Sequence, residues 1–287
     1  MHTMLWLEDE EGNEALPTVW DGEKDPEESL ETKSEKVAGF ADSLIQGSLQ
    51  KAACSKHEDT QDDCEHCQEI LRMVSTFQCH SHKKSCFKKR RKLRIHEGEG
   101  HGRLDGKTKD SEMTVDLCRY NFPKNPSDET CFIHAFPKDH PKEEVKKASD
   151  DYSKIRKFML RLTNKADFHS SEEWEKFQSL TFSEFLYAAG MYDEDVEYVE
   201  SDGESFAKAK RRYLEAMRIE VKSTGYILLK RTTKDVFINN FNKFLATIHP
   251  ANHDLQFITD PYAVLEYVTG KDHFLHTIVD SCIFLIL

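Results

Sequence analysis

Histidine and cysteine alternate with lysine in the stretch QCHSHKKSCFKK, and a further cysteine opens the stretch CRYNFP. His80 and His82 are separated by one residue, so both imidazoles of an extended segment lie on one side. Cys86 and Cys118 would add two thiolates, which completes the kind of ligand set that a tetrahedral zinc ion binds. We therefore expect a structural zinc held by these four residues, with Cys79 as a substitute ligand. The alternative is a basic loop with incidental histidines and cysteines, because the gap before Cys118 has no fixed length.

A second group of cysteines and histidines lies upstream, in the stretch CSKHEDTQDDCEHC. Its members are Cys54, His57, Cys64, His66 and Cys67. The Cys-x-x-Cys spacing at its end is one that metal sites use. Acidic residues crowd the segment, however, and no basic framework surrounds it. A second zinc is therefore a side hypothesis, and cysteines at the surface are the preferred interpretation.

Lysine and arginine dominate the residues around the first group. Residues 80–96 carry eight of them and no acid, although the whole chain has a formal net charge of −12. A local patch of that density attracts phosphate whatever the overall charge. The patch predicts DNA contacts at Lys83, Lys84, Lys88, Lys89, Arg90, Arg91, Lys92 and Arg94. A solvated run of charge without a ligand is the alternative.

A tyrosine on a predicted helix near the end of the chain is the third group that could do chemistry. In DPYAVLEYVTG, Asp260 can cap the first amides, and Pro261 suits the first helical position, where no amide hydrogen is needed. Tyr267 and Lys271 are then one turn apart on one face, whereas Tyr262 points elsewhere. A helical tyrosine can attack a phosphodiester when a metal or a basic group assists its ionisation. Most helical tyrosines are packing residues, so this interpretation needs a partner motif elsewhere.

Short strands and amphipathic helices must position these groups. Apolar, β-prone runs predict strands at residues 3–8, 226–231 and 254–260. Apolar residues at helical spacing predict helices at residues 65–77, 150–191 and 207–221. The acidic and turn-rich residues 9–36 are expected to leave the core.

Several apolar and polar side chains have structural roles in this reading. The expected core residues are Trp6, Leu7, Phe182, Phe185 and Leu186. The asparagines expected to organise a turn are Asn239, Asn240 and Asn242. His249 and His253 are expected at the surface, with a role as third metal ligand as the alternative.

Composition allows a modest core and long solvated insertions. Of the 287 residues, 38% are hydrophobic and 32% are charged, and the mean hydropathy is −0.67. The last apolar stretch, FLHTIVDSCIFLIL, is shorter than the roughly 20 residues that a bilayer span requires. Because no secretory pattern opens the sequence, we expect a soluble intracellular protein with reduced thiols. A phosphate loop of the form G-x-x-x-x-G-K-[ST] is absent, so no ATPase is expected.

Four stretches occur in an order that resembles the replication-initiator region of Helitron transposon proteins, which are eukaryotic rolling-circle elements. They read MHTMLWLE, CHSHKKSCFKK, CRYNFP and VFINNFNKFLATIHPANHDLQFITDPYAVLEYVTG. The resemblance runs from residue 1 to about residue 271 and is densest in residues 76–136 and 226–271. It implies an α+β fold, with an incomplete antiparallel initiator-type sheet that carries the three predicted strands, helical insertions and a small zinc knuckle.

The resemblance also implies a chemistry. Members of the family are His-hydrophobic-His endonucleases, in which two strand histidines hold Mg²⁺ or Mn²⁺ and a helical tyrosine attacks single-stranded DNA. His2 matches the second histidine and Tyr267 the first tyrosine, while Lys271 stands where a second tyrosine is expected and could contact phosphate. The first histidine would lie one residue before Met1. We therefore expect half of a metal site and little nicking, because a lone imidazole positions such an ion poorly.

The resemblance divides the chain into six expected segments. Residues 1–10 hold the first core strand, 11–75 an acidic and helical insertion, 76–136 the zinc knuckle with its basic patch, 150–212 a helical insertion, 213–271 the rest of the initiator domain, and 272–287 a divergent tail. The family pattern stops at the tail, and the helicase part that follows in the family is absent from this sequence.

Three functions are compatible with these observations. The chain is expected to be a transposon-derived fragment that binds single-stranded DNA, in the nucleus, with the parent transposon's full-length protein as a further partner. An active tyrosine endonuclease is the first alternative. A non-functional remnant of a helicase-containing transposon protein is the second.

Overall fold

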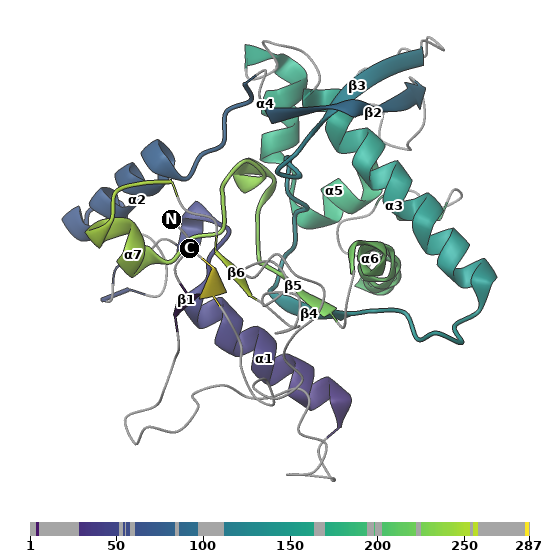
Figure 1. The fold of residues 1–287 in the computed structure, drawn as a ribbon, viewed down its shortest axis with the longest axis horizontal. Coiled ribbons are helices and arrows are strands. Elements are labelled where there is room, and N and C mark those ends of the chain that lie inside the picture. The colour runs from purple at the N-terminus through teal and green to yellow at the C-terminus, as the bar shows by residue number, and fades with distance from the viewer. Residues whose placement is uncertain are drawn as a thin grey trace, which may run out of the picture.

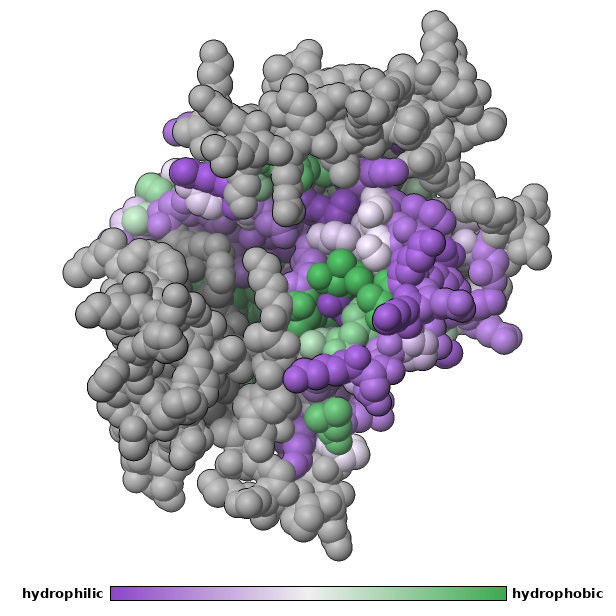
Figure 2. All heavy atoms as spheres, turned by 45° about the vertical axis from the view of Figure 1, so that its right-hand side comes forward, coloured by the Kyte–Doolittle hydropathy of each residue, from purple (hydrophilic) through white to green (hydrophobic). Residues whose placement is uncertain are grey.

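A computed structural model describes most of the chain, with gaps at several connections and at both ends. The described residues are 4–5, 29–51, 54, 56–57, 61–83, 86–96, 112–163, 170–193, 198, 203–221, 225–252, 255–257 and 285–286. Within them, the fold mixes seven helices with short antiparallel strands (Figure 1). None of these helices is long and apolar enough to cross a membrane. In Figure 2 the described part of one face is largely hydrophilic, with a small apolar area near its centre.

The largest core lies between four helices. They are α3 (Lys142–Thr163), α4 (Glu172–Ser179), α5 (Phe182–Ala188) and α6 (Gly203–Met217). Phe185 and Leu186 are fully buried there, as predicted, and Phe182 packs against the same cluster. A buried carboxylate, Asp151 of α3, accepts hydrogen bonds from Arg212 of α6. Trp6 and Leu7, the other predicted core residues, lie outside the described residues.

The described strands form three separate antiparallel sheets, although the sequence predicted one. Strand β5 (Gly225–Leu228) pairs with β4 (Cys131–His134), and β2 (Phe87–His96) pairs with β3 (Glu112–Cys118). The third sheet has the order β1-β7-β6, formed by Met4–Leu5, Leu285–Ile286 and Gln256–Phe257. Strand β7, which lies in the last residues of the chain, thus separates the first predicted strand from the last in this sheet.

Helix predictions succeeded where apolar spacing was regular. Helix α2 spans Glu65–Phe77, the range that was predicted, and buries Cys67, Ile70 and Val74. Helix α1 (Leu30–Leu44) was not predicted, because its buried stripe is narrow and consists of Val37, Ala38 and Ala41. Ser29 caps α1 by accepting a hydrogen bond from the amide of Thr32. The helix thus begins within the acidic segment, but its first buried residue is Val37, directly after that segment ends.

Arg231 connects the strands to the segment that follows them. Its buried guanidinium, 3% exposed, donates to the carbonyl oxygens of Asp235 and Ile238 at 2.8 and 2.6 Å and to Asn240 Oδ1 at 2.9 Å. Its backbone exchanges two hydrogen bonds with Ser127. This one side chain therefore fixes the turn at residues 235–240.

The predicted asparagine turn is present around this arginine. Asn240 also donates to the carbonyl of Leu255, and Asn239 donates to Asn252. Asn242 caps α7 (Lys243–Ile248) by accepting from the amide of Leu245. Asparagine suits this turn because its short side chain can form hydrogen bonds with neighbouring backbone groups.

The close approach of Gly47 to Arg231 gives a first prediction. A Cβ at Gly47 would lie 2.6 Å from Arg231 Nη2, and the guanidinium cannot retreat without breaking its three hydrogen bonds. Gly47→Ala should therefore lower the free energy of unfolding by about 1–3 kcal/mol, measured by urea denaturation. Gly39→Ala in α1, where a Cβ meets nothing within 4 Å, is the matched control and should stabilise by about 0.5–1 kcal/mol. Equal effects of the two substitutions would contradict the packing described for Gly47.

Candidate metal centres and the basic hairpin

Three of the four predicted zinc ligands converge in the structure. One ligand atom each from His80, His82 and Cys118 lies within 4.8 Å of the other two. Cys118 Sγ is 3.6 Å from His80 Nε2. His80 follows the end of α2, where its amide donates to the carbonyl of Phe237, and Cys118 ends β3. Segments that are far apart in sequence thus supply nitrogen and sulfur to one place.

Aromatic rings fix the two imidazoles. The His80 ring stacks on Phe122 with centroids 4.2 Å apart and planes 5° apart. The His82 ring meets the ring of Phe237 edge to face at 5.4 Å. Because Phe122 and Phe237 belong to the main core, the position of the histidines depends on the helical body.

The protonation of His80 suits metal binding. Burial lowers the pKa of His80 to about 4, and the nearby His82 and Lys124 act in the same direction. The imidazole is therefore neutral at physiological pH. A neutral ring offers a lone pair to a metal ion, whereas a protonated ring does not.

Cys86, the fourth predicted ligand, stays outside this 4.8 Å group. It is buried in the same core cluster as Cys118, and its Sγ accepts from the amide of Lys83 at 3.4 Å. The amide of Arg119 donates to the carbonyl of Cys86 at 2.7 Å, which ties it to the end of β3. Cys79, the substitute ligand, is exposed and also lies outside the group.

The basic run forms one strand of a hairpin, which the sequence did not predict. Strand β2 reads FKKRRKLRIH and pairs antiparallel with β3 (Figure 1). The register places Phe87 opposite Cys118, Lys92 opposite Asp116 and His96 opposite Glu112, with a shift between Phe87 and Lys92. The two strands follow one another in the chain and pair antiparallel, so they form a hairpin. The Cys/His group lies at the base of this hairpin.

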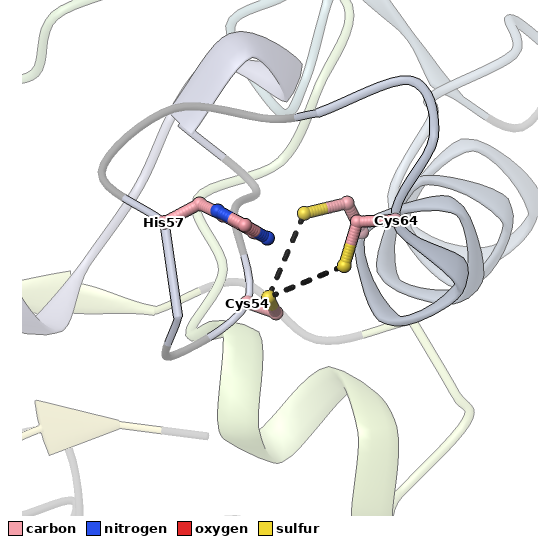
Figure 3. Close-up of side chains that lie close together, drawn as sticks. Cys54, His57 and Cys64 are labelled. Atoms are coloured by element: carbon pink, nitrogen blue, oxygen red, sulfur yellow. Dashed lines mark hydrogen bonds between the residues drawn. The ribbon is translucent and has the colours of Figure 1, made fainter.

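The second Cys/His group is more complete than the first. Ligand atoms of Cys54, His57, Cys64 and Cys67 all lie within 4.8 Å of one another (Figure 3). Cys54 is 6% exposed and Cys67 is fully buried, so the preference for surface cysteines was wrong for these two. His66 is exposed and is not part of the group.

Helix α2 explains how the second group forms. Cys64 is the residue before the helix and Cys67 lies in its first turn, so residues three apart face the same side. Cys54 and His57 come from the loop that precedes the helix. A small apolar cluster surrounds the thiols and includes Ile70, Val74, Ile238, Phe241 and Ala246. The amphipathic pattern of α2 was visible in the sequence, but the fold of the loop onto it was not.

The remaining predicted site residues are described in part or not at all. His2, Lys84, Tyr267 and Lys271 lie outside the described residues, as does His253. Lys83 and His249 are exposed, in agreement with the surface position expected for His249. For Lys88, Lys89, Arg90, Arg91, Lys92 and Arg94, the structure gives the strand and its register.

The low pKa of His80 gives a second prediction, for the metal-free protein. Between pH 6.5 and about 4 the unfolded chain binds a proton that folded His80 does not, so the free energy of unfolding should fall as pH falls through this window. A histidine-selective NMR titration should show the His80 ring titrating near pH 4, and urea denaturation should follow the decrease in stability. A His80 midpoint near 6.5 in the folded protein would contradict the burial of this ring.

No family model matches the chain, and no curated protein or solved structure shows significant similarity to it. The hairpin and the two Cys/His groups are therefore the features of the molecule that bear on its function.

Proposed function

We propose that this protein binds single-stranded DNA through the β2–β3 hairpin, whose base is organised by a zinc ion. The observation that carries the proposal is the position of the basic strand. It begins directly after Cys86, and its first residue, Phe87, pairs with Cys118 of the Cys/His group. A metal at this point would hold both strands of the hairpin at the end that joins the core.

The charge distribution supports a phosphate ligand. Strand β2 carries seven basic residues, counting His96, whereas the chain as a whole has a formal net charge of −12. The acidic residues of β3 stand opposite Lys92 and His96 in the register, not opposite residues 88–91. A strand this rich in basic residues on an acidic protein would be the part that binds DNA, because the net negative charge of the rest of the molecule repels phosphate.

The residues at the base fit zinc. Two imidazole nitrogens and one thiolate are ligands that zinc binds, and Cys86 is the neighbouring residue that could complete a tetrahedron. Zinc would supply no chemistry to DNA here. Its effect would be to restrict the hairpin, which lowers the entropic cost of binding.

The family resemblance agrees with this function and extends it. We propose that the chain derives from a Helitron replication initiator, that its sheets are an incomplete version of the initiator sheet, and that it acts in the nucleus. The parent transposon's full-length protein would be its protein partner. The support is the order of the shared stretches in the sequence. The predicted ligands of the zinc knuckle and the asparagines of the turn belong to these stretches and fall within the described residues.

A third prediction tests the hairpin. Lys88→Gln with Lys89→Gln should weaken binding to an unstructured oligonucleotide and should flatten the plot of log affinity against log salt, by about 0.7 for each phosphate that the variant no longer neutralises. The control is Lys142→Gln with Lys146→Gln, which makes the same charge change on exposed positions of α3. Fluorescence anisotropy at several salt concentrations measures both. Identical decreases in affinity for the two double variants would show that net charge, and not the hairpin, governs binding.

A fourth prediction concerns nicking. Of the groups that the resemblance assigns to DNA cleavage, the sequence holds His2 and Tyr267, with Lys271 in place of the second tyrosine. Incubation with single-stranded DNA and Mg²⁺ or Mn²⁺ should therefore give no covalent protein–DNA adduct on a denaturing gel. An adduct that disappears in Tyr267→Phe and survives in Tyr262→Phe would instead establish an active endonuclease.

A further inference from the structure

We infer that Cys54, His57, Cys64 and Cys67 form a zinc site of their own, separate from the group at the hairpin. The site would be structural, because all four positions of the tetrahedron come from protein side chains and none remains for water or substrate. Its task would be to fasten the loop before α2 to that helix and to the segment packed on it.

The spacing of the sulfur atoms matches zinc coordination. Cys54 Sγ is 3.7 Å from Cys64 Sγ and 3.7 Å from Cys67 Sγ (Figure 3). A zinc–sulfur bond of about 2.3 Å gives a tetrahedral sulfur–sulfur edge of about 3.8 Å. Two of the three sulfur–sulfur distances thus already match a zinc tetrahedron, and the third lies within 4.8 Å.

A disulfide explains this arrangement less well. Bonded sulfurs are about 2.05 Å apart, whereas Cys54 Sγ is equally far from two partners. Any one disulfide would leave the third thiol unused within or beside the apolar cluster. A metal ion uses all three thiols, whose protons would be released to solvent on binding.

His57 identifies the class of metal. Its imidazole points toward the sulfurs in Figure 3, and it is the one histidine of this segment whose ligand atom joins the group. Three thiolates with one imidazole are soft and borderline ligands, which favour zinc over magnesium or calcium. Of the acidic residues nearby that the structure describes, Asp62, Asp63 and Glu65 lie outside the group.

The packing around the site shows what the ion would stabilise. Cys54 and Cys67 lie in one apolar cluster with Ile238 and Phe241 and with Ala246 of α7. Helices α2 and α7 lie side by side (Figure 1). Removal of zinc should therefore loosen this pair, while α3 and α6 keep their own core.

The test is the zinc content of the reduced, full-length protein and of matched histidine variants. With both sites filled, the wild-type chain should bind two zinc ions, and His57→Ala should bind one. His66→Ala changes an exposed neighbour and should keep two. Cys67→Ser should also bind one zinc ion. When cobalt replaces zinc, the site with three sulfurs should give the stronger thiolate charge-transfer absorption, and His57→Ala should alter that absorption.

The outcomes separate this inference from the proposed function. If His82→Ala changes nothing while His57→Ala removes the only zinc, the inference stands and the zinc at the hairpin fails. If His57→Ala and Cys67→Ser both retain the wild-type zinc content, the inference is overturned. A Cys54 disulfide found by mass spectrometry in protein purified without a reductant would overturn it as well. Hydrogen exchange should rise in residues 65–77 and 243–248 of His57→Ala and should not change in α6.

Discussion

The buried guanidinium of Arg231 is the interaction on which the arrangement of the two Cys/His groups depends. It fixes the turn at residues 235–240 by donating to two carbonyls and to Asn240. From that turn the carbonyl of Phe237 receives the amide of His80, and Ile238 and Phe241 pack near Cys54 and Cys67. These hydrogen bonds compensate the buried charge, whereas removal of its acceptors would cost several kcal/mol. One side chain thus supports both sites.

The same two Cys/His groups lie at opposite ends of helix α2. Cys64 and Cys67 stand at its start, and His80 and His82 follow its end. Thirteen residues of helix span about 20 Å, so metals at both ends would be held at a fixed separation. Along the chain, the Cys/His group that contains Cys54, helix α2, the histidines of the other group and the basic hairpin follow one another, so that bound metals would fix the position of the proposed DNA-binding hairpin.

The sequence predicted these parts unequally, for physical reasons. Helix α2 was found because Ile70 and Val74 repeat at the helical period, and His80, His82 and Cys118 were found because zinc requires those residue types. The hairpin was missed because lysine and arginine have low strand propensity and give no alternation, so its pairing depends on β3. The burial of Cys54 was missed because it follows from long-range packing on Phe241, which no local pattern encodes. The expected single sheet failed for the same reason.

The pairing of β4 with β5 has a consequence for how the chain tolerates change in length. Helices α3, α4, α5 and α6 lie between these two strands in the sequence. Because β4 and β5 pair with each other, the chain enters the group of helices and leaves it at the same place. The entropy of closing such a loop grows only with the logarithm of its length. Insertions or deletions in the connections between those helices would therefore cost the strand pair little, and homologous chains could differ widely in size there while keeping the β2–β3 hairpin and the two Cys/His groups.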